Sequence, residues 1–138
     1  MKIQRFSNRH NRREYLECVS DLMGSSNIPD VDIFYNRVMA NDPNYITYVY
    51  TIEESIVATA AILYEYKLRY VQPKAYIEDV AVHPDHRGNG YGRSMVSYCY
   101  EEAKRRNAYK VVLSCSDNLI PYYKSLGFEK ENNFMIKH

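Results

Sequence analysis

The sequence predicts one α/β (α+β) domain with a mixed central β-sheet flanked by helices, and three observations carry this prediction. Stretches rich in β-branched and aromatic residues alternate with helix-like amphipathic stretches. The chain has 138 residues, the size of one ordinary domain, so we expect residues 1–138 to form a single domain. Hydrophobic residues make up 46% and charged residues 25%, which is typical of a folded globular protein.

The first part of the chain predicts a short strand and two helices. Residues 3–6 alternate apolar and polar side chains closely enough for a strand. Residues 11–23 place their apolar side chains near one helical face, and Asn11 followed by Glu14 resembles a capping box. Asp30 can cap the start of a second helix.

After the helices we expect a pair of strands joined by a short turn. Residues 24–27 are expected to end the first helix and residues 41–44 to form the loop before the strands, because both stretches consist of residues typical of turns. Residues 45–52 and 56–66 are rich in β-branched and aromatic side chains, as strands are. We therefore expect a hairpin with residues 53–55 at its turn.

The remaining stretches complete a sheet of mixed direction. After the hairpin we expect a turn at 72–74, a strand at 75–82, a helix at 90–106, a short strand at 110–114, a helix at 119–126 and a broken strand pair at 128–136. This order of elements indicates an α/β sheet whose strands run in both directions.

Composition and charge exclude several classes of protein. Lysine and arginine number 18 against 17 acidic residues, so the net charge of +1 gives no general attraction to nucleic acid or to a membrane. No stretch approaches the roughly 20 apolar residues of a membrane span, and Met1–Phe6 has no apolar signal core. A small enzyme and a small binding module remain open.

The cysteines and histidines indicate neither a disulfide framework nor a metal site. The 3 cysteines are odd in number and form no Cys-x-x-Cys pair, which favours a reducing, cytoplasmic location. We expect Cys115 to be a small buried residue rather than a nucleophile. His83 and His86 are three residues apart, but they lie beside a proline with no third ligand evident.

The most informative segment is Arg87–Gly92, which follows an expected strand and opens an expected helix. Glycines let the backbone adopt positive φ and approach a ligand closely. The first turn of a helix leaves N–H groups unpaired, and the helix dipole favours an anion such as pyrophosphate there. Arg87 and Arg93 can add charge-assisted hydrogen bonds to phosphate oxygens.

Several phosphate-binding loops compete as explanations of this segment. A Walker A loop ends in Gly-Lys-Ser/Thr, whereas Gly92–Ser94 reads Gly-Arg-Ser and the glycine spacing differs. A Rossmann fingerprint follows a strand early in the chain and has a third glycine that is missing here. The pattern Arg-x-x-Gly-x-Gly resembles the acetyl-CoA pyrophosphate loop of the GNAT acetyltransferase superfamily. The alternative is a glycine-rich turn that binds no ligand.

Two further motifs strengthen this resemblance. Residues 77–84 look like the strand that leads into the loop in that superfamily. Residues 118–128 resemble its closing motif, in which an Asn is followed by a Tyr and then by Gly-Phe. The resemblance implies a GNAT-fold N-acetyltransferase that uses acetyl-CoA as cosubstrate and needs no metal.

Over residues 56–138 the chain resembles one branch in particular, the eukaryotic-type glucosamine 6-phosphate N-acetyltransferases. The likeness lies in Glu78–Val80 and in the run 108–115. That branch acetylates the amine of glucosamine 6-phosphate, in the synthesis of UDP-N-acetylglucosamine, by direct attack on the thioester. The resemblance also implies a homodimer in which each active site borrows residues from the partner chain.

The resemblance assigns two sets of binding residues. Strand residues pair with the pantetheine arm as an added strand would, and the loop holds the pyrophosphate. The acetyl-CoA set is Val80, Ala81, Val82, Arg87, Gly88, Asn89, Gly90, Tyr91, Gly92, Arg93, Asn118 and Tyr123. The set for the amino sugar phosphate is Lys67, Tyr70, Glu78, Asp79, Val80, Ser114 and Lys137. In the family, the basic residue that Lys137 matches reaches the partner's phosphate.

The catalytic set is Tyr123, Glu78 and Asp79. A phenol with a pKa of about 10 stays protonated at neutral pH, so Tyr123 can donate to the departing thiolate. Glu78 is the candidate for helping the amine lose its proton, through a water molecule. Main-chain N–H groups near Val80 can stabilise the oxyanion.

Three positions depart from the branch and leave the acceptor open. Ser114 replaces an Asp, so it can hydrogen-bond a sugar hydroxyl but carries no charge. Tyr70 replaces a histidine, and Met23 lies nearest to a phosphate-binding Thr, with Ser25 and Ser26 as substitutes. The alternatives are a GNAT enzyme for another small amine or a peptide N-terminus, and a catalytically silent CoA-binding module.

Overall fold

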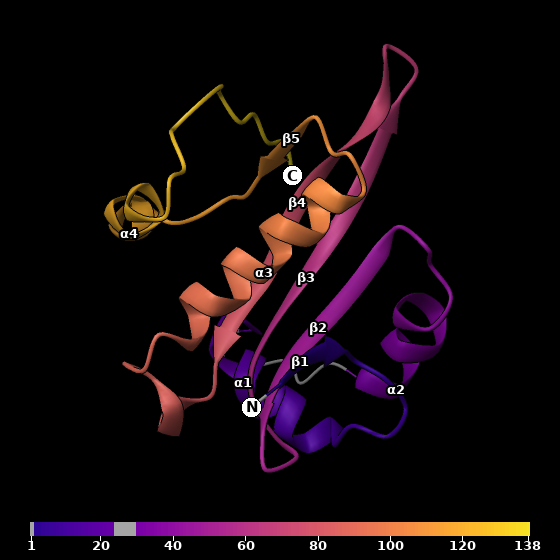
Figure 1. Ribbon diagram of the computed structural model, residues 1–138, viewed down its shortest axis with the longest axis vertical. Coiled ribbons are helices and arrows are strands. Elements are labelled where there is room, and N and C mark those ends of the chain that lie inside the picture. Colours follow the sequence, from indigo (N-terminus) through magenta and orange to yellow (C-terminus); the bar gives the residue numbers. More distant parts are fainter. Residues whose placement is uncertain (1, 24–29) are drawn as a thin grey trace.

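The computed structural model describes residues 2–23 and 30–138 as a five-stranded sheet with helices on both faces (Figure 1). The strands, in their order across the sheet, are β1 (Lys2–Arg5), β2 (Tyr45–Ile52), β3 (Ser55–Lys67), β4 (Tyr70–Val82) and β5 (Lys110–Val112). The helices are α1 (Arg12–Met23), α2 (Val31–Phe34), α3 (Tyr91–Arg105) and α4 (Ile120–Ser125). Strands β1 to β4 pair antiparallel and β5 joins β4 in parallel, which confirms the predicted mixed α/β sheet.

Helix α3 packs across one face of the sheet (Figure 1). Its buried side chains are Met95, Val96, Cys99 and Ala103. The strands meet this face with mostly small or branched residues, among them Ala58, Ala60, Ile62, Ala75 and Ile77. Burial of this apolar surface fixes the helix, so its N-terminus lies beside the end of β4.

The opposite face of the sheet is covered by α1 and α2. Cys18 and Val19 of α1 pack with a second group of buried residues that includes Phe6, Val49, Ile56 and Ala81. The predicted cap residues of both helices are confirmed. The Asn11 Oδ1 atom accepts hydrogen bonds from the N–H groups of Arg13 and Glu14, and Asp30 Oδ1 accepts one from Ile33.

The second helix differs from the expectation in its length. Helix α2 has a single turn, and a π-helical stretch, Tyr35–Met39, continues it. The end of α1 expected at 24–27, with Ser25 and Ser26, lies outside the described residues. No helix in the described part of the chain combines the length and apolarity needed to cross a membrane.

The turn predicted at 72–74 is wrong. Pro73 lies inside β4, and the chain reverses at residues 68–69 instead. The register between β3 and β4 shifts here, because Glu65 pairs with Lys74 but Lys67 pairs with Tyr70. A proline has no N–H to give to a regular ladder, and such an irregularity in the pairing accommodates it.

The strand pair predicted at 128–136 is also wrong. Residues 126–138 form no regular secondary structure. Phe134, Met135 and Ile136 are exposed by 83%, 88% and 70%, so this chain buries none of them. Strand β5 is correspondingly short and ends at Val112, two residues before the predicted end.

Candidate active site

The glycine-rich loop joins β4 to α3 through a turn of 3₁₀-helix, Pro84–His86. Gly88 and Gly90 adopt φ of +82° and +81°, the left-handed region in which glycine pays no steric cost. Gly90 is the N-cap of α3, and no side chain within the described ranges caps this helix start. The first N–H groups of a 15-residue helix are therefore free to bind an anion.

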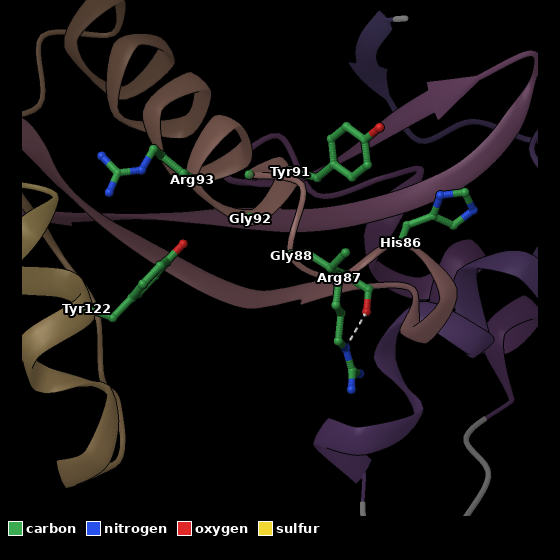
Figure 2. Close-up of a pocket in the computed structure, with 9 residues that line it drawn as sticks. His86, Arg87, Gly88, Tyr91, Gly92, Arg93 and Tyr122 are labelled. Atoms are coloured by element: carbon green, nitrogen blue, oxygen red, sulfur yellow. Dashed lines mark hydrogen bonds between the residues drawn. The ribbon is translucent and has the colours of Figure 1, made fainter.

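A cavity of about 240 Å³ opens beside this helix start. Figure 2 shows the Tyr122 hydroxyl of α4 pointing across it toward Gly92. A Cβ at Gly92 would lie 3.4 Å from that hydroxyl and 3.5 Å from Val82 Cγ2. A larger residue would thus fill space between α3, α4 and β4, and the loop and helix start fit a pyrophosphate-bearing group.

The two arginines of the predicted phosphate site point in different directions (Figure 2). The Arg87 guanidinium pairs with Asp21 of α1, and its Nε donates to the Val82 carbonyl at 3.2 Å. Arg93 lies on the Tyr122 side and reaches Ser125 Oγ at 3.5 Å. Both arginines line the cavity, and the Arg87 guanidinium is already shared between Asp21 and the Val82 carbonyl.

The other loop residues support the turn itself. The Asn89 side-chain amide donates to the His86 carbonyl at 3.1 Å. His83 Nδ1 accepts from the Asp85 N–H at 3.1 Å, and its Nε2 lies 2.9 Å from Glu17 Oε2 of α1. The described ranges contain no group of three or more potential metal ligands.

Within the described residues, one edge of β4 is unpaired between the cavity and the short stretch that pairs with β5. Its parallel pairing with β5 covers only Lys74–Tyr76. Beyond Tyr76, residues Val80 and Val82 are half-buried and have no paired strand on that side in the described part of the chain. An extended pantetheine-like arm can add along this edge as a further strand.

A β-bulge lies at the other end of this edge. The register between β3 and β4 skips one residue, so Asp79 and Val80 together stand opposite Ala60. Asp79 has φ of +51°, which is rare for a residue with a side chain. Desolvation, followed by the charge of Asp79, raises the pKa of Glu78. Two adjacent carboxylates, Glu78 and Asp79, thus lie near the end of the unpaired edge that is further from the cavity.

The two tyrosines of α4 have different surroundings. Tyr123 is half-buried and packs edge-on against Tyr122 and Phe128, with ring centroids 5.0 and 6.0 Å away. Burial, with smaller effects of Tyr122 and Cys115, raises the pKa of the Tyr123 phenol. Tyr122 lines the cavity and Tyr123 does not, which the sequence pattern alone did not indicate.

None of the seven predicted substrate residues lines this cavity. Glu78, Asp79 and Val80 lie further along β4. The other four are Lys67, Tyr70, Ser114 and Lys137. Lys67 lies near the tip of the β3–β4 hairpin, 3.5 Å from Glu65. The Tyr70 ring stacks on Tyr109 at 4.3 Å. Ser114 and Lys137 are exposed and lie outside regular structure. The structure spreads these four over the surface. Of the predicted cofactor residues, the cavity is lined by Val82, Arg87, Gly88, Gly90, Tyr91, Gly92 and Arg93, and not by Val80, Ala81, Asn89, Asn118 or Tyr123.

Two other residues singled out in the sequence, Cys115 and Asn118, also lie outside the cavity lining. Cys115 is exposed, so the expectation that it is buried is wrong, because β5 ends before it and the following loop leaves the sheet. Asn118 lies in a 3₁₀ turn, Asp117–Leu119, and accepts a hydrogen bond from Ser116 Oγ at 2.5 Å.

The sequence of this chain is similar to those of known acetyltransferases. The sequence profile of the acetyltransferase (GNAT) family matches residues 9–128. A glucosamine 6-phosphate N-acetyltransferase of Schizosaccharomyces pombe is 32% identical over 105 residues, which are 72% of this chain and 95% of that protein.

Two solved structures share the fold over nearly their whole length. The glucosamine-6-phosphate N-acetyltransferase of Arabidopsis thaliana has a TM-score of 0.83 and 25% identity, covering 99% of this chain and 97% of that one. A putative acetyltransferase of Agrobacterium tumefaciens has a TM-score of 0.87 and 28% identity, covering both chains fully, 100% each.

Proposed function

Because this chain belongs to the acetyltransferase (GNAT) family, we propose that it transfers the acetyl group of acetyl-CoA to the amine of glucosamine 6-phosphate. The proposal rests on the way three features follow one another in the structure. These are the uncapped N-terminus of α3, the unpaired edge of β4 and the adjacent residues Glu78 and Asp79. The names of the fission yeast and plant relatives support the choice of acceptor.

Binding accounts for a large part of the proposed catalysis. The α3 N-terminus and the glycine loop hold the pyrophosphate, and the β4 edge at Val80–Val82 holds the pantetheine arm in an extended form. The thioester then lies at the bulge, beside the acceptor amine. Holding two reactants in attack geometry supplies much of the rate of an acyl transfer. Acetyl-CoA supplies the activated acyl group and a thiolate leaving group.

Groups of this chain accept the proton of the amine, stabilise the oxyanion and protonate the leaving thiolate. Glu78 accepts the amine proton through a water molecule, and its raised pKa brings it closer to the ideal of a base at neutral pH. Main-chain N–H groups near Val80 stabilise the oxyanion. Tyr123 donates its phenolic proton to the leaving sulfur, and burial, which raises the pKa of that phenol, keeps it protonated.

A second candidate is acetylation of a different small amine or a peptide N-terminus. Ser114 has no charge with which to orient an ammonium group, and Tyr70 stacks on Tyr109. The similarity to a bacterial putative acetyltransferase is compatible with such a change of acceptor. We further propose a homodimer that shares its active sites, located in the cytoplasm.

Thiol release from acetyl-CoA tests these candidates in one experiment. The enzyme is incubated with glucosamine 6-phosphate, glucosamine or a panel of peptides. Release with the phosphorylated sugar alone supports the first proposal, and release with another amine supports the second. Binding of acetyl-CoA without release in any tube contradicts both and indicates a silent binding module.

A further inference from the structure

The Asp79 backbone is held in an unfavourable conformation. Its φ of +51° places a residue with a Cβ in the left-handed region, which costs an L-residue free energy. Such a conformation persists only where neighbouring groups determine it, and it occurs most often at functional sites. A contact that fixes the Asp79 side chain would therefore also fix the β-bulge of β4.

Tyr45 on β2 makes that contact. Its hydroxyl donates a hydrogen bond to Asp79 Oδ2 at 3.4 Å, across the intervening strand β3. Ala61, which pairs with Thr47 on one side and Glu78 on the other, occupies β3 at this level with only a methyl group. The small side chain leaves room for the Tyr45 phenol to reach over β3.

The Tyr45 ring is fixed at its other end. Phe34 of α2 meets it edge-on, with ring centroids 5.7 Å apart and an interplanar angle of 86°. Burial and the negative charge of Asp79 raise the pKa of Tyr45, so its hydroxyl remains a donor at neutral pH. Burial, with the charges of Tyr45 and Asp79, also raises the pKa of Tyr15 on α1. Phe34 and Asp79 thus hold the two ends of the Tyr45 side chain behind the bulge.

We propose that Tyr45 is a positioning residue for the acceptor end of the active site. Its hydroxyl holds the Asp79 carboxylate, which keeps Asp79 and Val80 in the bulge where amine and thioester meet. This role rests on the proposed function, because it assumes that the reacting groups meet at this bulge. Tyr45 itself touches neither substrate.

The test replaces Tyr45 by Phe, which removes the hydroxyl and keeps the ring that packs on Phe34. We expect kcat/KM for the acceptor to fall about tenfold, the usual effect of losing a hydrogen bond to a charged group. The KM for acetyl-CoA should stay unchanged, since the loop and α3 are untouched. Tyr48→Phe is the matched control, because Tyr48 lies on the same strand but faces α3 and Tyr98.

Coupling to Asp79 separates positioning from a general loss of stability. In an Asp79→Ala background, which removes the oxygens that accept the hydrogen bond, Tyr45→Phe should add no further loss of kcat/KM. An additive loss, or an equal loss in Tyr48→Phe, would overturn the proposal.

Hydrogen exchange provides a readout that needs no acceptor. The backbone amides of Asp79 and Val80 should exchange faster in Tyr45→Phe than in the wild type, while Tyr48→Phe leaves them unchanged. If no amine is acetylated by the wild type, the proposed function fails, yet this measurement still decides whether Tyr45 holds the bulge. Unchanged exchange in Tyr45→Phe would refute the role.

Discussion

At the scale of single residues, the active site depends on which of two adjacent phenols reaches the leaving sulfur. Tyr122 points into the cavity toward Gly92 (Figure 2). Tyr123 is half-buried between Tyr122 and Phe128. Neighbours on a helix project about 100° apart, so we expect only one of the two side chains to reach the reacting groups. The resemblance to the closing motif predicts that Tyr123 is catalytic, whereas Tyr122 is the tyrosine that lines the cavity.

Separate Tyr→Phe variants of these two residues distinguish the roles. We expect Tyr123→Phe to lower kcat about 10²–10⁴-fold with little change in CoA affinity, because only the acid that protonates the thiolate is lost. Tyr122→Phe should mainly raise the KM for acetyl-CoA. Steady-state kinetics and calorimetric CoA titration check both. A loss of kcat confined to Tyr122→Phe would exchange the two assignments.

The pH profile reports on Glu78. Only the ionised carboxylate accepts a proton, so kcat/KM should increase as pH rises through the pKa of Glu78. Desolvation and Asp79 raise that pKa above the ordinary 4.5, so the increase should occur at a higher pH than for a free glutamate. Glu78→Gln should remove this acidic limb and lower kcat/KM about 10²-fold. A profile that keeps its acidic limb in Glu78→Gln would show that another group is the base.

At the scale of elements, the loop and the first turn of α3 form the proposed cofactor site, and we expect their glycines to have separate functions. Gly90 needs its left-handed φ to start the helix, whereas Gly92 lies within the helix and faces the cavity. A side chain at Gly90 would be strained by the backbone conformation, and we expect one at Gly92 to compete with the proposed ligand for space.

Gly92→Ala should therefore weaken binding without weakening the fold. Alanine favours a helix over glycine by about 1 kcal/mol, and the nearest atoms lie at ordinary contact distances of 3.4 and 3.5 Å. We expect the melting temperature to stay or rise while the Kd for CoA increases about tenfold, measured by thermal unfolding and calorimetry. Gly90→Ala should instead lower the melting temperature, because its φ of +81° strains any side chain. Unchanged CoA affinity in Gly92→Ala would remove this turn from the cofactor site.

Local patterns in the sequence predicted the elements that depend on local interactions. The capped helix starts at Asn11 and Asp30, and the glycine loop before α3, follow from neighbouring residues. Pro73 was misread as a turn because the irregular pairing with β3 that accommodates it is a tertiary feature. The Tyr45–Asp79 contact spans two strand spacings and 34 residues, so no spacing rule could have found it.

At the scale of the whole molecule, two layers converge on the cofactor loop. Helix α3 provides the proposed anion site on one face of the sheet, and α1 reaches the same loop from the other face through the pairs Asp21–Arg87 and Glu17–His83. The C-terminal segment contributes little inside this chain, because Phe134–Ile136 are exposed. Apolar side chains left this exposed fit the proposal that a partner chain covers them.

Complementation tests the proposed sharing of active sites. If Lys137 acts in the partner's site, Lys137→Ala should lose activity on glucosamine 6-phosphate, as Tyr123→Phe does. Refolding the two variants together forms heterodimers in which one site combines an intact Tyr123 with an intact Lys137. Random assortment makes half of the dimers mixed and repairs one site in each, so activity should return to about a quarter of the wild-type value. If the two variants stay inactive after refolding together, or if light scattering shows a monomer, each chain builds its site alone. No residue of one chain could then act in the site of the other.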